Sequence, residues 1–227
     1  MGNTVDMRTC LSLAAPVMLA YVAIGIPCGV MEAQVGFTPL MALLFSATYY
    51  SGAGQYMVSS LWFAGMPLTS IFLNISLVTT RQLLYSAAFA PYVRLERRSR
   101  SLPFAALVTD ETFGINLDRF SAGGDWDLAH AQTINAACML SWACANCLGA
   151  ALGSGASLPV DVMSFGMTAI FICLLMGQLK SRSAKVAAVC AALVVVCCKL
   201  LGVSGSAIFV GALAGVVCGV VVVEVEP

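Results

Sequence analysis

One arginine of this chain lies in the middle of an apolar segment, where a charged side chain is costly. Arg81 occurs in the sequence LNISLVTTRQLLYSAAF, within a predicted helix over 67–92. An arginine near the centre of a bilayer costs from about 3 to more than 10 kcal/mol, so it is kept where it lines a wet cavity or meets a partner. Arg94 lies about 20 Å further along a helix, too far for easy snorkelling toward that end. We therefore expect an internal polar partner for Arg81, or a hydrated cavity around it.

Two neighbouring acids, Asp110 and Glu111 in LVTDETFGIN, are the candidate partners of Arg81. The alternative is that Thr109 or Asp110 is only the N-cap of the helix that follows. Both interpretations can hold, because a capped helix start inside a membrane is itself a site for ions or carboxylates. The chemistry expected is a guanidinium fork for a carboxylate, or for neutralising a buried acid, and an acid for an ammonium group or a proton.

A second polar feature interrupts an apolar segment at Gly52, Gly54 and Gln55, in the sequence SGAGQ. Glycines there permit either close helix packing or a broken helix that exposes backbone groups. Gln55 adds an amide that hydrocarbon would penalise, so these residues are candidates for a pathway lining.

Polar residues also accompany Arg81 in its own segment. Asn74 precedes Arg81 by two helical turns and shares its face, and Thr80 and Gln82 flank it. A polar stripe on a lipid-embedded helix indicates a hydrated, inward-facing lining. We therefore include Asn74, Thr80 and Gln82 among the candidate substrate-contacting residues.

The segments that must position these residues are apolar and long. No Asp, Glu, Lys or Arg occurs between Glu32 and Arg81, and 60% of the 227 residues are hydrophobic while 10% are charged. One crossing of a hydrocarbon core of about 30 Å needs about 20 residues, so the chain is predicted to be a polytopic membrane protein. The net charge of zero gives no indication of a nucleic-acid partner.

The fold class expected is all-α, a helical membrane bundle that forms a single permease domain over 1–227. We expect about seven spans, each of about 20 residues, with one short re-entrant helix at 103–119. Pro16, Gly25, Pro27 and Gly29 are expected to break up the first segment. The predicted helices are 10–31, 39–64, 67–92, 103–119, 130–153, 161–180, 186–202 and 205–223.

Orientation follows from the two basic clusters, one around Arg94 to Arg100 and one from Lys180 to Lys185. Both are expected to face the cytoplasm. Counting three crossings before Arg94 places the N-terminus outside, and Arg8 disagrees mildly with that placement. Two crossings after Lys185 place the C-terminus in the cytoplasm.

The ten cysteines are interpreted as small apolar residues. Cys144 and Cys147 have CxxC spacing, but no second pair or nearby histidine completes a zinc site. The sequence has no HExxH, GxSxG or GxxxxGK[ST] motif. We therefore expect no enzyme activity, no cofactor and no metal.

Three stretches resemble the AzlC-like, azaleucine-resistance family of branched-chain amino-acid exporters. SATYYSGAGQYMVSSL resembles its AGxxQF-like motif, NISLVTTRQLLYSAAFAPYV its NxRHxLxS-like signature, and LVTDETFGIN its LTDExFA-like motif. The motifs occur in order, and the resemblance runs from about Pro16 to the C-terminus. This chain departs from the pattern at Thr80, where the family usually has Asn, and at Gln82, where it usually has His.

The resemblance implies a multi-pass permease of the bacterial inner membrane. Such a permease is the large subunit of a pair with a small, separately encoded AzlD-like subunit, and the assembly state is left open to include an oligomer. The function expected is secondary, alternating-access export of branched-chain or other small amino acids. Arg81, Asp110 or Glu111, and Gln55 with Gly52 and Gly54 are expected to contact the substrate. The alternative is a scaffold or regulatory subunit that does not transport.

Overall fold

The computed structural model describes residues 6–94, 96–123, 126–155, 181–201 and 207–225, with scattered residues between 165 and 179. The chain divides into two compact units, Met1–Met167 and Thr168–Pro227. The described residues form helices and no strand, as the predicted all-α class requires. Three of these helices, Met7–Gln34, Leu128–Gly153 and Arg182–Leu200, are long and apolar enough to cross a membrane.

The first unit is built on two long helices, α1 (Met7–Gln34) and α8 (Leu128–Gly153), which cross in backbone contact. A Cβ added at Gly29 would lie 2.0 Å from the Asn146 carbonyl oxygen, and one at Gly149 would lie 2.1 Å from that of Ile26. Small residues allow membrane helices to approach in this way. The prediction that Pro16 and Pro27 help to break up the first segment is wrong, because both lie inside the continuous helix α1.

The predicted single helix over 39–64 is instead two helices, α2 (Pro39–Thr48) and α3 (Gly52–Phe63). The chain leaves the helical conformation at Tyr49, and the extended Ser51 caps α3 by accepting the backbone N–H of Gly54. Ten and twelve residues give helices of about 15 and 18 Å, each about half of a crossing. Of the two interpretations of the glycine-rich stretch, the broken helix is therefore present.

The segment after α4 (Leu68–Ala88) and the short α5 (Ala90–Val93) is broken in the same manner. The helix predicted at 103–119 is two helices, α6 (Arg98–Ala106) and α7 (Asp110–Ala122). Thr109 is the N-cap of α7 and forms a capping box with Thr112, which confirms the predicted cap. The expected half-membrane element is therefore a pair of helices.

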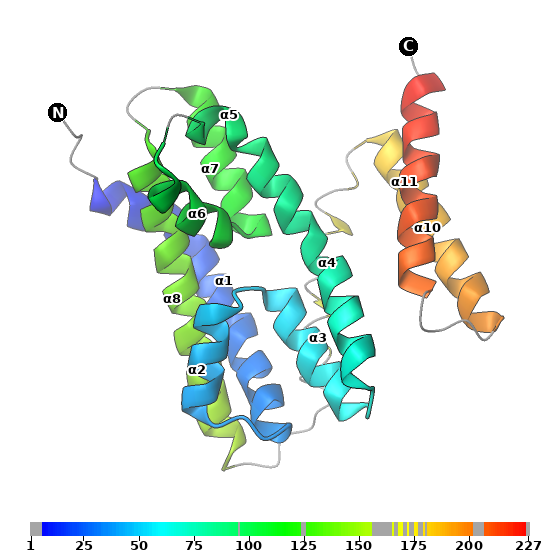
Figure 1. Cartoon of the computed structure of the whole chain (residues 1–227), viewed down its shortest axis with the longest axis horizontal. Helices are drawn as coiled ribbons and strands as arrows, with labels where there is room; N and C mark the ends of the chain where they lie inside the picture. The colour runs from blue at the N-terminus through cyan, green and yellow to red at the C-terminus, as the bar shows by residue number, and fades with distance from the viewer. Residues whose placement is uncertain are drawn as a thin grey trace. The chain divides into compact units, whose positions relative to one another are not determined.

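The two broken pairs enter the first unit from opposite ends (Figure 1). The pair α2 and α3 begins and ends at the end where α1 finishes and α4 starts, whereas α6 and α7 begin and end where α4 finishes and α8 starts. Neither pair forms one continuous helix long enough to cross, which makes α1 and α4 the candidate crossings before Arg94. This arrangement offers two candidate crossings before Arg94 where the sequence predicted three, and the side of the N-terminus stays a prediction.

The second unit pairs α10 (Arg182–Leu200) with α11 (Ala207–Val225). Gly211, Gly215 and Gly219 form a stripe on α11 that packs on Ala187, Ala191 and Val195 of α10. The span predicted at 161–180 lies largely outside the described residues, as do Lys180 and Glu226.

Candidate functional site

The guanidinium of Arg81 meets an acid from another helix. Its Nη1 lies 2.7 Å from Oδ2 of Asp110, and the two side chains are 32% and 14% exposed. Arg81 comes from the middle of α4, whereas Asp110 is the first residue of α7. The structure therefore places the predicted internal partner at a helix start, where the macrodipole also favours negative charge.

Glu111, the second predicted acid, has a different partner on α1. The Tyr21 hydroxyl donates to Oε2 of Glu111 at 2.7 Å and lies 2.8 Å from Oγ1 of Thr109. Tyr21 is 4% exposed, so a buried phenol holds the start of α7 against the middle of α1. Glu111 forms no ion pair with a described cation, which leaves its charge available for a ligand.

The break between α2 and α3 contacts α4 and α1, the two helices that also contact the start of α7. Nε2 of Gln82 donates to the Tyr50 carbonyl oxygen at 3.4 Å, and the Tyr21 and Tyr50 rings meet edge to face with centroids 6.3 Å apart. Arg81 and Gln82 are consecutive residues, so one turn of α4 contacts both breaks. The two breaks therefore lie at the same level of the first unit.

Gln55 is fully buried and occupies a network that links α2, α3 and α8. Its Oε1 accepts the indole N–H of Trp142 at 2.6 Å, and its Nε2 donates to the Tyr49 carbonyl oxygen at 3.0 Å and to Ser46 Oγ at 3.2 Å. A buried amide without partners would cost several kcal/mol, so these bonds explain its place in an apolar bundle. They also fix the geometry of the break at Tyr49.

The glycines of the break make room for aromatic rings. A Cβ added at Gly54 would lie 2.1 Å from the Tyr49 hydroxyl oxygen, and one at Gly52 would lie 3.2 Å from Cη2 of Trp142. Trp142 also packs edge to face on Tyr21, with centroids 5.4 Å apart. Close packing, the other sequence-based interpretation, is therefore present together with the broken helix.

The residues that meet at the two helix breaks are called here the constellation around Arg81. Two predicted residues, Asn74 and Thr80, lie outside it. Nδ2 of Asn74 donates to the carbonyl oxygen of Ser70 at 2.8 Å, and Oγ1 of Thr80 donates to that of Ser76 at 2.9 Å. These are bonds to the helix's own backbone, a common way to satisfy a polar side chain in an apolar helix. Among Asn74, Thr80 and Gln82, it is Gln82 that reaches the break.

Sequence reasoning missed Tyr21, Tyr50 and Trp142. Their polar atoms were the available signal, because a hydroxyl or indole N–H in an apolar segment must find a partner. Which partner each finds depends on how α1 and α8 cross, and no local pattern contains that information.

The two helix starts differ in charge. The first turn of α7 carries Asp110 and Glu111, whereas the first turn of α3 carries no acid. A helix N-terminus attracts anions, and a carboxylate attracts an ammonium group. Arg81 and Asp110 neutralise each other, so the remaining potential is positive at the start of α3 and negative at Glu111. Among the described residues, no group of three or more His, Cys, Asp or Glu side chains could hold a metal ion.

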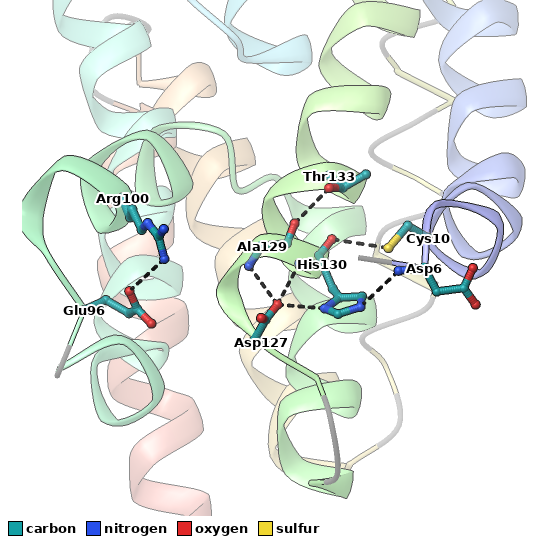
Figure 2. A network of polar contacts seen from close by, with 8 residues as sticks. All are labelled: Asp6, Cys10, Glu96, Arg100, Asp127, Ala129, His130 and Thr133. Atoms are coloured by element: carbon teal, nitrogen blue, oxygen red, sulfur yellow. Dashed lines mark hydrogen bonds and ion pairs between the residues drawn. The ribbon is translucent and has the colours of Figure 1, made fainter. Parts of the chain in front are cut away.

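A separate polar network ties the start of α1 to the start of α8 (Figure 2). The Asp6 N–H donates to Nε2 of His130 at 3.3 Å, and Nδ1 of His130 lies 2.7 Å from Oδ1 of Asp127. Partial burial opposes ionisation of Asp127, but hydrogen bonds from His130 and from backbone N–H groups hold its pKa below the usual value. Hydrogen bonds from Thr9 similarly lower the pKa of Asp6. His130 is thus part of a structural tie outside the constellation around Arg81.

Comparison with protein-family models matches residues 16–155 to the family described as AzlC protein. This range contains both helix breaks and every residue of the constellation around Arg81. No solved structure matches the chain.

Individual relatives are membrane proteins. One of Helicobacter pylori strain J99 is 32% identical over 189 residues, covering 82% of each chain. The inner membrane protein YgaZ of Escherichia coli is 26% identical over 224 residues, covering 96% of this chain and 89% of its own. The branched-chain amino acid transport protein AzlC of Bacillus subtilis is 23% identical over 176 residues, covering 75% and 67%.

Proposed function

This chain belongs to the AzlC protein family, and we propose that it is a secondary transporter that exports branched-chain or other small amino acids by alternating access. Its relatives are named as membrane or inner membrane proteins, and one is named as a branched-chain amino acid transport protein. The multi-pass helical architecture agrees with a cell-membrane location. The direction of transport, the substrate and the mechanism are our proposal.

One observation carries the proposal: two helix breaks from opposite ends meet around Arg81 and Gln82. Broken helices expose backbone N–H and C=O groups that are costly in hydrocarbon, unless they are buried in protein or line a hydrated cavity. Transporters use such breaks at mid-depth to bind substrate and coupling ions. The position of the charged and amide groups at this level supports a substrate site there.

The charges suggest how an amino acid would be held. Its carboxylate would lie against the acid-free start of α3, at Gly52 and Gly54, with Arg81 nearby. Its ammonium group would pair with Glu111, whose charge has no described cation partner. Arg81 neutralises Asp110 in this state, and its guanidinium could instead turn toward the substrate as the breaks move.

Gln55 positions the site. Its bonds to Trp142 and to the Tyr49 carbonyl oxygen hold the start of α3, at Gly52, in place beside the break. Alternating access would then move the pair α2 and α3, or the pair α6 and α7, against the α1 and α8 core. A small AzlD-like membrane subunit is the proposed partner, and it follows from the family resemblance.

Counterflow in proteoliposomes tests the proposal. Purified protein, with and without the small subunit, would exchange labelled leucine, isoleucine or valine across the membrane. Glu111→Gln should abolish exchange, because it removes the charge for the ammonium group, whereas Asp118→Asn, an exposed acid of the same helix, should leave it unchanged. Wild-type protein with its partner that exchanges no amino acid in a broad panel would refute the proposed function.

A further inference from the structure

Glu32, near the end of α1, is an acid that the proposed substrate site does not use. Its side chain is fully buried, and its Oε2 atom has no hydrogen-bond partner. Its Oε1 lies 4.0 Å from Sγ of Cys28, one turn earlier on the same helix, which is at most a weak contact. No described ion pair includes Glu32.

The helices packed around this end of α1 carry no cation that could neutralise Glu32. The ranges of α2, α3 and α8 contain no Lys or Arg, and His130 lies at the far end of α8. The titratable neighbours are the thiol of Cys28 and the phenol of Tyr56 on α3, which are neutral donors. The helix α7 carries the charged residues Asp110, Glu111, Asp118 and Arg119, and it contacts α1 at Tyr21.

An ionised carboxylate in such surroundings would cost several kcal/mol, and buried acids avoid that cost by binding a proton. An uncharged Leu or Met would fill the same volume without that difficulty. Acids inside membrane proteins are expensive, and they often serve as proton relays. The position of Glu32 therefore fits a residue that binds and releases a proton.

We propose that Glu32 is a proton-binding site that couples proton movement to amino-acid transport, which rests on the proposed function. The carboxylate takes up one proton when it is sealed in this state and releases it when α3 moves away and admits water, with no other reactant. Glu32 lies about 16 Å along α1 from Tyr21, so it is separate from the substrate site but on the same helix.

The contacts of α3 explain how substrate binding at the break would change the surroundings of Glu32. Tyr56 is fully buried, and its hydroxyl donates to the Ile24 carbonyl oxygen of α1 at 2.6 Å. Gln55, the preceding residue, fixes the break where the substrate is proposed to bind. A displacement of α3 by substrate would therefore also move the phenol that packs near Glu32.

Two assays on Glu32→Gln test this proposal in protein reconstituted with its small subunit. Glutamine has the shape of a protonated glutamate, so amino-acid counterflow at equal pH should persist. Uptake driven by an imposed pH gradient should be lost, since the variant has no proton to exchange. Glu96→Gln, the same change at a half-buried acid beside Arg100, is the matched control and should respond to the gradient like wild type.

Infrared spectroscopy provides a readout independent of transport. The carbonyl band of a protonated carboxyl group in wild-type protein should disappear in Glu32→Gln and persist in Glu96→Gln. A gradient response that survives in Glu32→Gln, or an unchanged infrared band, would overturn the proton site. A Glu32→Gln variant that fails to fold, while Glu32→Asp folds and keeps the gradient response, would support it. Absence of counterflow in wild type would instead refute the proposed function, and the infrared band would still decide whether Glu32 holds a proton.

Discussion

Arg81 and Gln82 are adjacent on α4, yet each contacts a different helix break. The Arg81 guanidinium pairs with Asp110 at the start of α7, and the Gln82 amide donates to the Tyr50 carbonyl oxygen between α2 and α3. Successive residues of a helix point about 100° apart, so the two breaks approach α4 from different sides at one level. A single helix turn thus links the two pairs of short helices that enter the first unit from opposite ends.

The effects of substituting Arg81 and Asp110 on the free energy of unfolding should be coupled, because the two side chains form an ion pair. Arg81→Ala leaves an uncompensated acid and should lower the free energy of unfolding by about 1–3 kcal/mol, since both side chains are only partly exposed. The double variant Arg81→Ala with Asp110→Ala should be less destabilised than the sum of the two single changes. Thermal unfolding in detergent measures all three, and additive losses would argue against a direct interaction.

The contact between α1 and α8 should not tolerate a methyl group at Gly29. Gly29→Ala places a Cβ against the Asn146 carbonyl and should destabilise the protein by more than about 2 kcal/mol. Gly114→Ala on α7 is the control, because nothing lies within 4 Å of its added Cβ. That change should be neutral, or stabilising by up to about 1 kcal/mol, because alanine favours the helix. Equal melting temperatures of the two variants would contradict the backbone contact.

Trp142→Phe should weaken the break between α2 and α3. The change removes the indole N–H that donates to Gln55, and leaving a buried amide oxygen short of a partner costs about 1–3 kcal/mol. Trp62→Phe, at a ring that is 50% exposed, should change stability little. Amino-acid counterflow should fall in Trp142→Phe alone, and retention of full exchange would show that this bond does not position the site.

The N-terminus should lie on the same side of the membrane as the basic cluster that contains Arg97. With α1 and α4 as the crossings between them, single cysteines at Arg8 and Arg97 should react from one side, and one at Met66 from the other. The assay uses an impermeant thiol reagent on a Cys-depleted background. Labelling of Arg8→Cys and Arg97→Cys from opposite sides would restore the crossing count predicted from the sequence.

Low pH should weaken the tie between α1 and α8, because Asp127 then becomes protonated. Its pKa in the folded protein lies below the ordinary 3.8, so its stabilising contribution is complete above that value. It is lost as the pH falls through the folded-state pKa, because the unfolded chain takes up the proton more readily. Unfolding followed as a function of pH should show this acid loss in wild type and a smaller one in Asp127→Asn. Parallel pH profiles would exclude a contribution from Asp127.

The residues that meet at the two helix breaks could be singled out from the sequence because polar groups are conspicuous in apolar segments, whereas their role in binding substrate stays a proposal. Arg81, Asp110, Glu111, Gln55 and the two glycines were identifiable from the cost of burying charge and backbone. The cap at Thr109 followed from a local pattern as well. Asn74 and Thr80 were included on helical spacing, and the structure shows them bonded to their own backbone.

The sequence by itself determined that this protein is a helical membrane bundle, because composition and segment length record the solvent in which the chain folds. Only the tertiary structure decided that 39–64 forms two helices with a break between Thr48 and Gly52, and that Tyr21 contacts both breaks. An apolar run of two helices with a short break looks like one long span, since hydrocarbon imposes the same composition on both. The direction that the chain takes after Tyr49 depends on contacts with α1, α4 and α8, which are remote in the sequence.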